Sequence, residues 1–320
     1  MKIGIIGTSF ILASILPQMK RAGMELGAVC SRREETGRAL AAEHGIPAVY
    51  TQLEEMLADP ALDWIYVCTP NSLHYPQAKA ALEAGKNVLC EKPMVPTEGQ
   101  ARELSALARE KGLWLFETAA TAYHPNYQLI RRRLPELGDI QAALCWFCQY
   151  SSRYQALLDG QNPNVFNPAF AGGALMDLNL YNIHFAVGLW GPPQGVKYLA
   201  HTHTNGIDTH GLALLEYPGF VCQCMGAKDG QGKNEVQIVG EKGYLRVTPG
   251  ASNCQKVEFS LRGREPEVIE LPENSWHYEM QAIAGMVARE DRAECDRLLE
   301  VSCQVARVLE EARRDGGLGF

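Results

Sequence analysis

Asn87-Val88-Leu89-Cys90-Glu91-Lys92-Pro93 is the stretch around which the rest of this chain is organised. Its first four residues are mostly apolar, which predicts a buried strand of a parallel sheet. An acid, a base and a proline follow at the carboxyl end, where an open α/β sheet binds its ligands. A lysine in this place can carry protons, because burial and nearby charges shift its pKa. The plain alternative is a surface ion pair at the end of a strand.

Short apolar strands alternate with helices on both sides of this stretch. The pattern predicts strands over residues 2–7, 25–30, 64–68 and 113–116, with helices over about 11–21, 34–44 and 97–111 among those that connect them. Capping boxes at Thr51 and Thr97 mark two helix starts. This rhythm predicts a doubly wound parallel Rossmann sheet over residues 1–120.

The turn after the first strand is expected to bind the phosphates of a dinucleotide, because backbone N–H groups and a helix amino end converge there. The glycine fingerprint is incomplete. Gly7 takes the first place of G-x-G-x-x-G, but Ser9 and Leu12 take the second and third. The position of this turn in the alternating pattern therefore supports a cofactor site more than its letters do.

The end of the second strand is where a dinucleotide fold contacts the adenine ribose. Arginine there accommodates a 2′-phosphate, whereas an acid binds the free 2′-hydroxyl. The segment Ser31-Arg32-Arg33 favours NADP, and the adjacent Glu34 and Glu35 keep NAD open. The residues expected to contact the cofactor are Gly7, Thr8, Ser9, Phe10, Ile11, Ser31, Arg32, Thr69, Pro70, Asn71, His74, Glu91 and Lys92.

Residues 121–320 are expected to form a second α/β domain with an open, mostly antiparallel sheet. The pattern predicts a long strand over residues 140–150, a polar loop over 151–171, and about six strands between residues 196 and 271. Turns at residues 217–219, 230–232 and 241–243 indicate hairpins. Two helices, about 276–289 and 293–314, close the chain.

One helix, expected from about residue 173 to 189, carries a polar constellation. Asp177, Tyr181 and His184 are spaced i, i+4 and i+7 and should share one helix face. A carboxylate, a phenol and an imidazole together can hold sugar hydroxyls and pass a proton. Taken singly, each has a plain alternative: a charge that complements the helix dipole, a half-buried phenol and a packing histidine.

Composition excludes several classes of protein. The net charge of -7 argues against a nucleic-acid partner, and no apolar run is long enough to span a membrane. Ten cysteines without a signal peptide fit reduced thiols and a cytoplasmic location. Cys145 and Cys148 are spaced C-x-x-C, and Cys222 and Cys224 are two apart, but both pairs lie in predicted strands. No metal site is therefore expected.

Two motifs resemble the Gfo/Idh/MocA family of NAD(P)-dependent oxidoreductases. The first is Thr69-Pro70-Asn71 with His74, followed by Ala84-Gly85-Lys86 and Glu91-Lys92-Pro93. The second is Gly172-Gly173-Ala174-Leu175-Met176-Asp177 with Tyr181. Tyr181, together with Phe116-Glu117 and Pro125, makes this sequence similar to one branch of the family, the one near glucose-fructose oxidoreductase and dimeric dihydrodiol dehydrogenase.

The resemblance implies hydride transfer between nicotinamide and a hydroxyl-bearing carbon of a sugar, cyclitol or diol. It implies that Lys92 is the catalytic lysine, that Asp177 orients it and that Tyr181 is the second proton-handling residue. The same three residues and His184 are expected to bind substrate. A homodimer or homotetramer is also implied, because the family's open sheet often forms an interface.

Three positions depart from the family pattern: Ser9, Ala122 and Asn179. Ala122 and Asn179 leave the substrate class open, whereas Ser9 places a Cβ where the pyrophosphate is expected to approach. Two other functions also stay open, namely a cofactor-binding regulator or sensor on the same fold and an NAD-dependent glycoside hydrolase.

Overall fold

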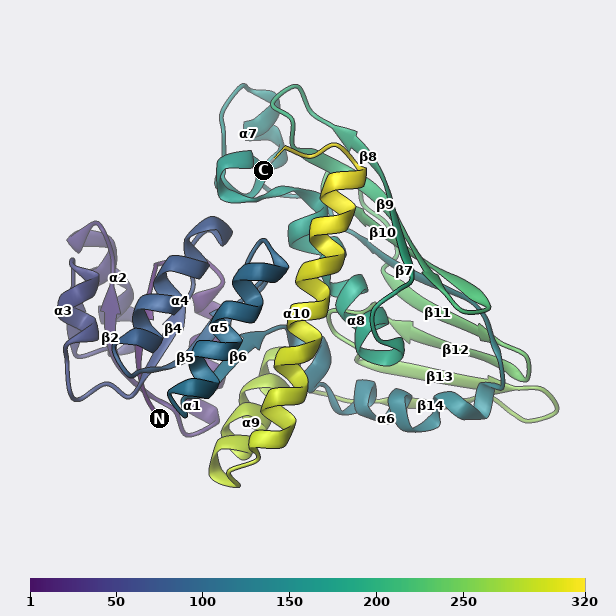
Figure 1. Cartoon of the computed structure of the whole chain (residues 1–320), viewed down its shortest axis with the longest axis horizontal. Helices are drawn as coiled ribbons and strands as arrows, with labels where there is room; N and C mark the ends of the chain where they lie inside the picture. Colours follow the sequence, from purple (N-terminus) through teal and green to yellow (C-terminus); the bar gives the residue numbers. More distant parts are fainter. Residues whose placement is uncertain (320) are drawn as a thin grey trace.

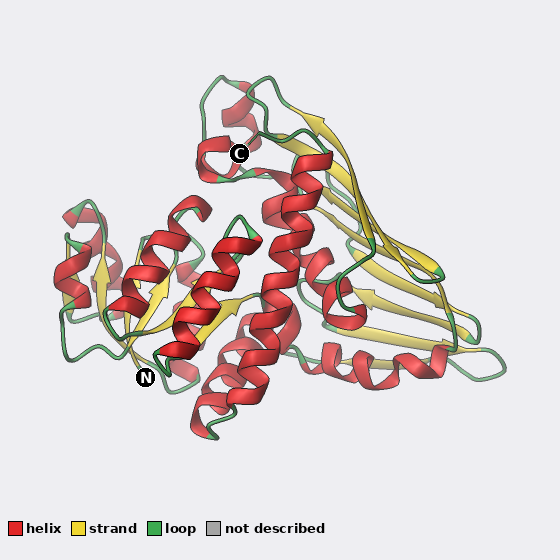
Figure 2. Ribbon diagram, viewed as in Figure 1, coloured by secondary structure: helices red, strands yellow, loops and turns green. Residues whose placement is uncertain are grey.

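The protein is described by a computed structural model that covers residues 1–319, so Phe320, the last residue of the expected second domain, lies outside the described residues. Two sheets stand side by side, and the long helix α10 (Arg292–Asp315) runs between them (Figures 1 and 2). The fold class predicted from the sequence is confirmed.

The first sheet has six parallel strands in the order β3-β2-β1-β4-β5-β6, the order of a doubly wound dinucleotide fold. Both faces are covered, and Val88, Leu89 and Cys90 of the central stretch are fully buried. The strands are β1 (Lys2–Ile6), β2 (Glu25–Cys30), β3 (Ala48–Tyr50), β4 (Trp64–Val67), β5 (Asn87–Glu91) and β6 (Leu115–Thr118). The connecting helices are α1 (Leu12–Arg21), α2 (Glu34–His44), α3 (Leu53–Leu57), α4 (His74–Glu83) and α5 (Glu98–Glu110).

The second sheet has eight strands in the order β14-β13-β12-β11-β7-β10-β9-β8. Only β7 and β10 pair in parallel, so the expected mostly antiparallel sheet is confirmed. The strands are β7 (Ile140–Cys148), β8 (Gly195–Thr202), β9 (Asp208–Tyr217), β10 (Phe220–Ala227), β11 (Glu235–Gly240), β12 (Gly243–Thr248), β13 (Lys256–Leu261) and β14 (Glu267–Glu270).

Two details of this sheet differ from the sequence prediction. Seven strands, not six, follow residue 190. The turn at residues 230–232 does not close a hairpin, because β7 lies between β10 and β11 and pairs with both. The hairpins at residues 217–219 and 241–243 are confirmed. A strand from a distant part of the chain can insert between two sequence neighbours, and turn residues do not reveal this.

One face of the second sheet packs against helices, with α8 and α10 on the side of the first sheet (Figure 1). Residues alternate along β7: Cys145 is fully buried, whereas Trp146 is 44% exposed on the other face. The remaining helices are α6 (Pro125–Arg133), α7 (Tyr154–Leu158), α8 (Leu180–Trp190) and α9 (Ser275–Ala288), with a π-helical segment η6 (Leu175–Asn179). Short 3₁₀ turns are η1 (Asn71–Leu73), η2 (Ala120–Tyr123), η3 (Leu134–Leu137), η4 (Asn164–Phe166) and η5 (Pro168–Phe170).

Two hydrophobic cores correspond to the two sheets, and α10 contributes to both, whereas α9 contributes only to the first. Met280 and Leu299 belong to the core of the first sheet, whereas Val308 and Leu309 belong to the core of the second. We keep the expected domain bounds, residues 1–120 and 121–320, as a proposal in which each domain contains one of the two sheets. Within the described residues, α9 and the first half of α10 complete the first core.

No helix in residues 1–319 is both long enough and apolar enough to cross a bilayer.

Candidate functional site

The end of β5 meets the start of the polar helix of the second half. Lys92 follows β5 directly, and its peptide bond to Pro93 is cis. The Lys92 ammonium donates to the Asp177 carboxylate oxygen Oδ1 at 2.8 Å and to the Asp177 main-chain oxygen at 3.0 Å. The two motifs recognised in the sequence are therefore parts of one site at the carboxyl edge of the first sheet.

Asp177 lies in a widened helical turn. The sequence predicts one α-helix from about residue 173, but residues 175–179 are π-helical and α8 begins at Leu180. Single π turns are frequent at functional sites. The start of this segment is anchored from β9, because the main-chain N–H of Leu175 donates to Asp208 Oδ2 at 2.7 Å. The extra residue in the turn moves Asp177 out of the α-helical line on which His184 was expected to follow it.

Tyr181 completes the group around Lys92. Its ring centroid lies 4.8 Å from the Lys92 nitrogen and 5.8 Å from the centroid of the Phe147 ring. The Tyr181 hydroxyl bonds to no other group in residues 1–319, and it keeps contact with solvent. A phenol in this state is available to a substrate hydroxyl.

The charges of the site determine its protonation. Burial raises the pKa of Asp177, but Lys228 and Lys92 outweigh it, so the pKa lies below its usual value. Burial lowers the pKa of Lys92, but the Asp177 charge outweighs it and the pKa is raised. Burial raises the pKa of Tyr181, although the Lys92 charge opposes this. At neutral pH the site therefore holds a carboxylate, an ammonium and a neutral phenol.

Lys228 is a member of this group that the sequence analysis missed. It follows β10 directly, its side chain is only 2% exposed, and its ammonium forms an ion pair with Asp177 Oδ2. It also lies over the ring of Phe166, 4.9 Å from the centroid. The available signal was the pair Lys228-Asp229 directly after an apolar strand, the same arrangement that singled out Lys92.

The structure does not bring His184 to the other predicted substrate residues. Its side chain is 3% exposed, and its Nε2 lies 3.3 Å from Glu117 Oε2 of β6. Glu117 in turn accepts from the main-chain N–H of Met94 at 2.7 Å. His184 therefore links α8 to the first sheet behind the site.

Two other predicted cofactor residues have their polar atoms engaged within the protein. The His74 ring lies between two main-chain oxygens, with Nδ1 2.9 Å from Pro93 O and Nε2 2.8 Å from Thr69 O. Glu91 Oε1 accepts from the hydroxyls of Tyr66 and Thr118. These side chains shape the loops at the sheet edge.

Asn71 connects the two halves above the same edge. Its side-chain amide donates to the main-chain oxygen of Ala171 at 2.8 Å. The segment that contains Ala171 follows the long polar loop of the second half. Asn71 and Pro70 therefore lie where the second half approaches the cofactor edge of the first sheet.

The turn after β1 has the features of a phosphate cradle. Gly7 has a φ of 106°, and a Cβ there would lie 2.3 Å from the main-chain oxygen of Cys68. The main-chain N–H groups of Thr8, Ser9, Phe10 and Ile11 have no main-chain partner within the described chain. These groups and the amino end of α1 suit an anion such as a pyrophosphate, so the residues present fit a dinucleotide.

The end of β2 offers positive charge and a hydroxyl. Arg32 and Arg33 are exposed, while Ser31 is 8% exposed and its hydroxyl lies 2.7 Å from that of Thr36. Two exposed guanidinium groups at the end of this strand can pair with a 2′-phosphate.

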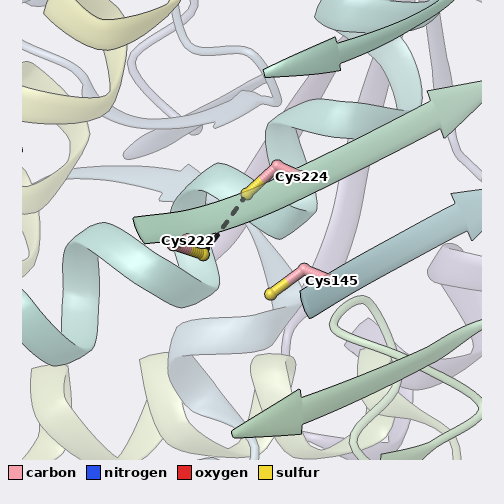
Figure 3. Close-up of side chains that lie close together, drawn as sticks. All are labelled: Cys145, Cys222 and Cys224. Carbon is pink, nitrogen blue, oxygen red and sulfur yellow. Dashed lines mark hydrogen bonds between the residues drawn. The ribbon is translucent and has the colours of Figure 1, made fainter. Parts of the chain in front are cut away.

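Three buried cysteines lie close together in the second core (Figure 3). Cys222 and Cys224 of β10 have sulfurs 3.7 Å apart, and the sulfur of Cys145 on β7 lies within 4.8 Å of both. The group cuts across the two pairs that the sequence suggested, because Cys145 is beside Cys224 in the parallel register. All three belong to the hydrophobic cluster of the second core, where charged thiolate ligands would be costly.

Two family models match most of the chain. "Oxidoreductase family, NAD-binding Rossmann fold" matches residues 1–118, and "GFO/IDH/MocA C-terminal domain" matches residues 128–246.

Among curated proteins, the chain is 36% identical to the uncharacterized oxidoreductase YgjR of Escherichia coli (strain K12), with 100% of this chain and 97% of the relative covered. It is 31% identical to the scyllo-inositol 2-dehydrogenase (NADP(+)) IolU of Bacillus subtilis (strain 168), over 100% and 98%. Among solved structures, it resembles the 3-ketoreductase KijD10 of Actinomadura kijaniata, in complex with NADP and TDP-benzene, with a TM-score of 0.84, 24% identity and coverage of 98% and 97%.

Proposed function

The chain belongs to the Gfo/Idh/MocA oxidoreductase family, and from that premise we propose that Lys92, Asp177 and Tyr181 form its catalytic centre. The protein is an NAD(P)-dependent oxidoreductase that acts on a CH–OH group. The observation that carries the residue assignment is the 2.8 Å contact between the Lys92 ammonium and the Asp177 carboxylate, which joins the two halves at the sheet edge.

Hydride transfer is the chemistry that a bound nicotinamide supplies. This chain's own residues handle the substrate oxygen. An ammonium has three N–H donors, and two on Lys92 are engaged by Asp177. The third remains for the substrate oxygen, whose developing negative charge it stabilises.

Tyr181 carries the proton in this proposal. In the reduction direction its neutral phenol donates to the oxygen of the carbonyl group as the carbon gains hydride. In the oxidation direction the substrate hydroxyl loses its proton to the deprotonated phenol as its carbon loses hydride. Lys92 favours the deprotonated form of Tyr181, because its positive charge lies 4.8 Å from the centroid of the Tyr181 ring and stabilises a phenolate. Asp177 keeps Lys92 charged and in place.

The proposed substrate is a sugar or a cyclic polyol. The relative named scyllo-inositol 2-dehydrogenase supports a cyclitol-sized molecule with several hydroxyl groups. One free N–H on Lys92 and the free hydroxyl of Tyr181 suit such a molecule. We place His184 as support for the pocket wall from α8, through its contact with Glu117.

NADP is the proposed preference over NAD. The exposed Arg32 and Arg33 support it, as does the NADP-specific name of the inositol relative. Replacing Arg32 by Ala should weaken NADP binding about tenfold or more and leave NAD binding nearly unchanged. Equal dissociation constants for the two cofactors in the unchanged protein would refute the preference.

A dehydrogenase screen over sugars and cyclitols tests the function, read as formation of reduced nicotinamide. Lys92→Ala and Tyr181→Phe should each lower kcat by about 10² to 10⁴ on the substrate found, with cofactor binding nearly kept. Lys79→Ala, which removes a surface ion pair between α4 and α5, is the control and should keep full activity. Full turnover by both site variants would refute the assignment.

The same screen separates the alternatives. A protein that binds cofactor yet oxidises or reduces nothing in a broad panel is a regulator or sensor. Release of the leaving group from a chromogenic glycoside without net cofactor reduction would identify a glycoside hydrolase.

A homodimer formed through the open face of the second sheet is also part of the proposal. Apolar side chains stand exposed on the strands of this sheet, among them Trp146, Leu199 and Val221, and exposed apolar surface of this kind is typical of interfaces. Leu199→Glu should shift the mass measured by light scattering from dimer to monomer. A monomeric unchanged protein would exclude the dimer.

The ten cysteines, all free thiols, support a cytoplasmic location.

A further inference from the structure

Lys228 occupies a place in the site that charge balance alone does not require. Its main-chain N–H donates to Thr209 O at 2.8 Å, which fixes the backbone directly after β10. From there the side chain passes the Phe166 ring and reaches Asp177, with 2% of its surface exposed. A buried lysine is rare without a carboxylate partner. Here that partner is the carboxylate that already pairs with Lys92.

Asp177 therefore serves two ammonium groups. Lys92 takes Oδ1 and Lys228 takes Oδ2. The last torsion of an aspartate side chain is broad and has no sharp preferred angle. With a partner on each oxygen, the carboxylate plane is held in one orientation, and Oδ1 stays aimed at Lys92.

At the centre of this trio, two ammonium groups share the single carboxylate of Asp177. Asp208 of β9 also interacts electrostatically with Lys228, but the described chain shows no ion pair between them. Its Oδ2 accepts from the N–H of Leu175 and the hydroxyl of Tyr198, each at 2.7 Å, and its Oδ1 is buried without a hydrogen-bond partner. Glu91 and Tyr181 face Lys92 from β5 and α8, and Glu279 of α9 lies near Tyr181. One carboxylate thus separates two like charges.

We propose that Lys228 is a positioning residue of the active site, which orients Asp177 and whose buried charge makes Lys92 and Tyr181 release their protons more readily. This inference rests on the proposed catalytic centre. Lys228 does not touch the substrate, because its side chain is buried behind Asp177. It acts through hydrogen-bond geometry and through charge, and these two effects can be separated.

Three substitutions separate them. Lys228→Gln keeps a donor for Asp177 but removes the charge, Lys228→Met removes both, and Lys228→Arg keeps both. Lys86→Met is the matched control, because Lys86 is also largely buried but donates to the main-chain oxygens of Asp59 and Leu62, away from the site.

The first readout is the pH profile of kcat/KM in the oxidation direction. A second positive charge on the same carboxylate should shift the pKa of a neighbouring group by about one to two units. The rising limb should move to higher pH by about one unit in both Lys228→Gln and Lys228→Met, whichever of Lys92 and Tyr181 loses the proton. Lys228→Arg should restore the original limb, and Lys86→Met should not move it.

The second readout is kcat at the optimum of each variant. Lys228→Met should lose about 10- to 100-fold because Asp177 is no longer held, and Lys228→Gln should lose clearly less. An unmoved limb in both neutral variants overturns the charge effect. Equal kcat in Lys228→Met and the unchanged protein overturns the positioning. If Lys228→Met does not fold, Lys228→Gln and Lys228→Arg carry the test.

A third readout does not need turnover. Trace acetylation across a pH series, followed by peptide mass spectrometry, reports how readily Lys92 loses its proton. Lys92 should react at higher pH in Lys228→Gln than in the unchanged protein, and equal reactivity overturns the inference. If no sugar or polyol is turned over, the proposed function fails, but this measurement still decides the role of Lys228.

Discussion

At the scale of single residues, the second motif is explained by close contacts. A Cβ on Gly173 would lie 1.9 Å from Asp208 Oδ1, and one on Gly172 would lie 2.8 Å from the Val165 backbone. Asn179, where the family usually has glycine, is fully buried and donates to Cys224 O at 2.8 Å. This departure therefore ties the π-helical segment to β10.

Gly173→Ala is the sharpest test of that packing. Gly173 also has a φ of 97°, so alanine adds backbone strain to the clash with Asp208. We expect a loss of about 2 to 4 kcal/mol in the free energy of unfolding, measured by chemical denaturation. Gly99→Ala is the control, because a Cβ there meets nothing within 4 Å. A Gly173→Ala protein as stable as that control would contradict the packing argument.

The buried Glu279 should make the stability of the protein depend on pH. It is 1% exposed, and burial, followed by the nearby Glu91 and Glu117, raises its pKa well above the usual value. The folded state therefore holds this proton more tightly than the unfolded state, so stability falls as pH rises above about 4.5. Glu279→Gln should raise the free energy of unfolding at pH 8 by about 1 to 3 kcal/mol and have little effect near pH 4.

The exposed Glu103 provides the control for that measurement. Glu103→Gln, which removes a partner of Tyr75 and Lys79 at the surface, should change stability only slightly at either pH. Parallel stability curves for Glu279→Gln and the unchanged protein would show that Glu279 does not titrate as its burial requires.

At the scale of elements, helix starts illustrate what local sequence can decide. At Thr97 only half of the capping box is confirmed: its hydroxyl accepts from the N–H of Gln100, but Gln100 Oε1 bonds to no group in the described chain. The one at Thr51 is wrong, because α3 is capped at Gln52 without a side-chain bond. A capping pattern states only which bond is available, and packing of the helix decides which residue begins it.

His124 at the start of α6 predicts a pH-dependent helix cap. Its Nδ1 accepts from the N–H of Asn126 at 3.2 Å, and burial lowers its pKa to about 4. The unfolded state binds the proton first, near pH 6.5, so the stability is complete above that pH and is lost as pH falls toward 4. About 2 to 3 kcal/mol should disappear over this window.

His124→Asn should keep the cap and remove much of this acid sensitivity, because asparagine is a good N-cap residue that does not titrate. Denaturation at a series of pH values between 4 and 7 measures it. His201→Asn, at an exposed position on β8, serves as the control and should leave the slope unchanged. An equal slope in the His124→Asn protein would refute the assignment.

At the scale of the whole molecule, α10 couples the two halves. It contacts α5 and β6 of the first sheet and α8 and β8 of the second. Leu299 and Val308 lie on the same helix but in different cores. The two halves should therefore unfold together.

Leu299→Ala tests this coupling. Leu299 is 4% exposed, so its truncation should cost about 2 to 4 kcal/mol. Hydrogen exchange followed by mass spectrometry should show weaker protection in both sheets, although the residue lies in the first core. Glu300→Ala, at the exposed neighbouring position, should change neither. Loss of protection confined to residues 1–120 would contradict a shared unfolding unit.

The sequence by itself predicted the alternating strands and helices, the carboxyl edge of the first sheet as the cofactor edge, and Lys92, Asp177 and Tyr181 as candidate site residues, because hydrophobic periodicity and short motifs are local properties of a chain. Only the tertiary structure decided that β7 lies between β10 and β11, that His184 turns to Glu117 and that Lys228 shares Asp177. Each of these depends on contacts between residues far apart in the chain, and the free energy of such contacts comes from burial and charge pairing that no local pattern records.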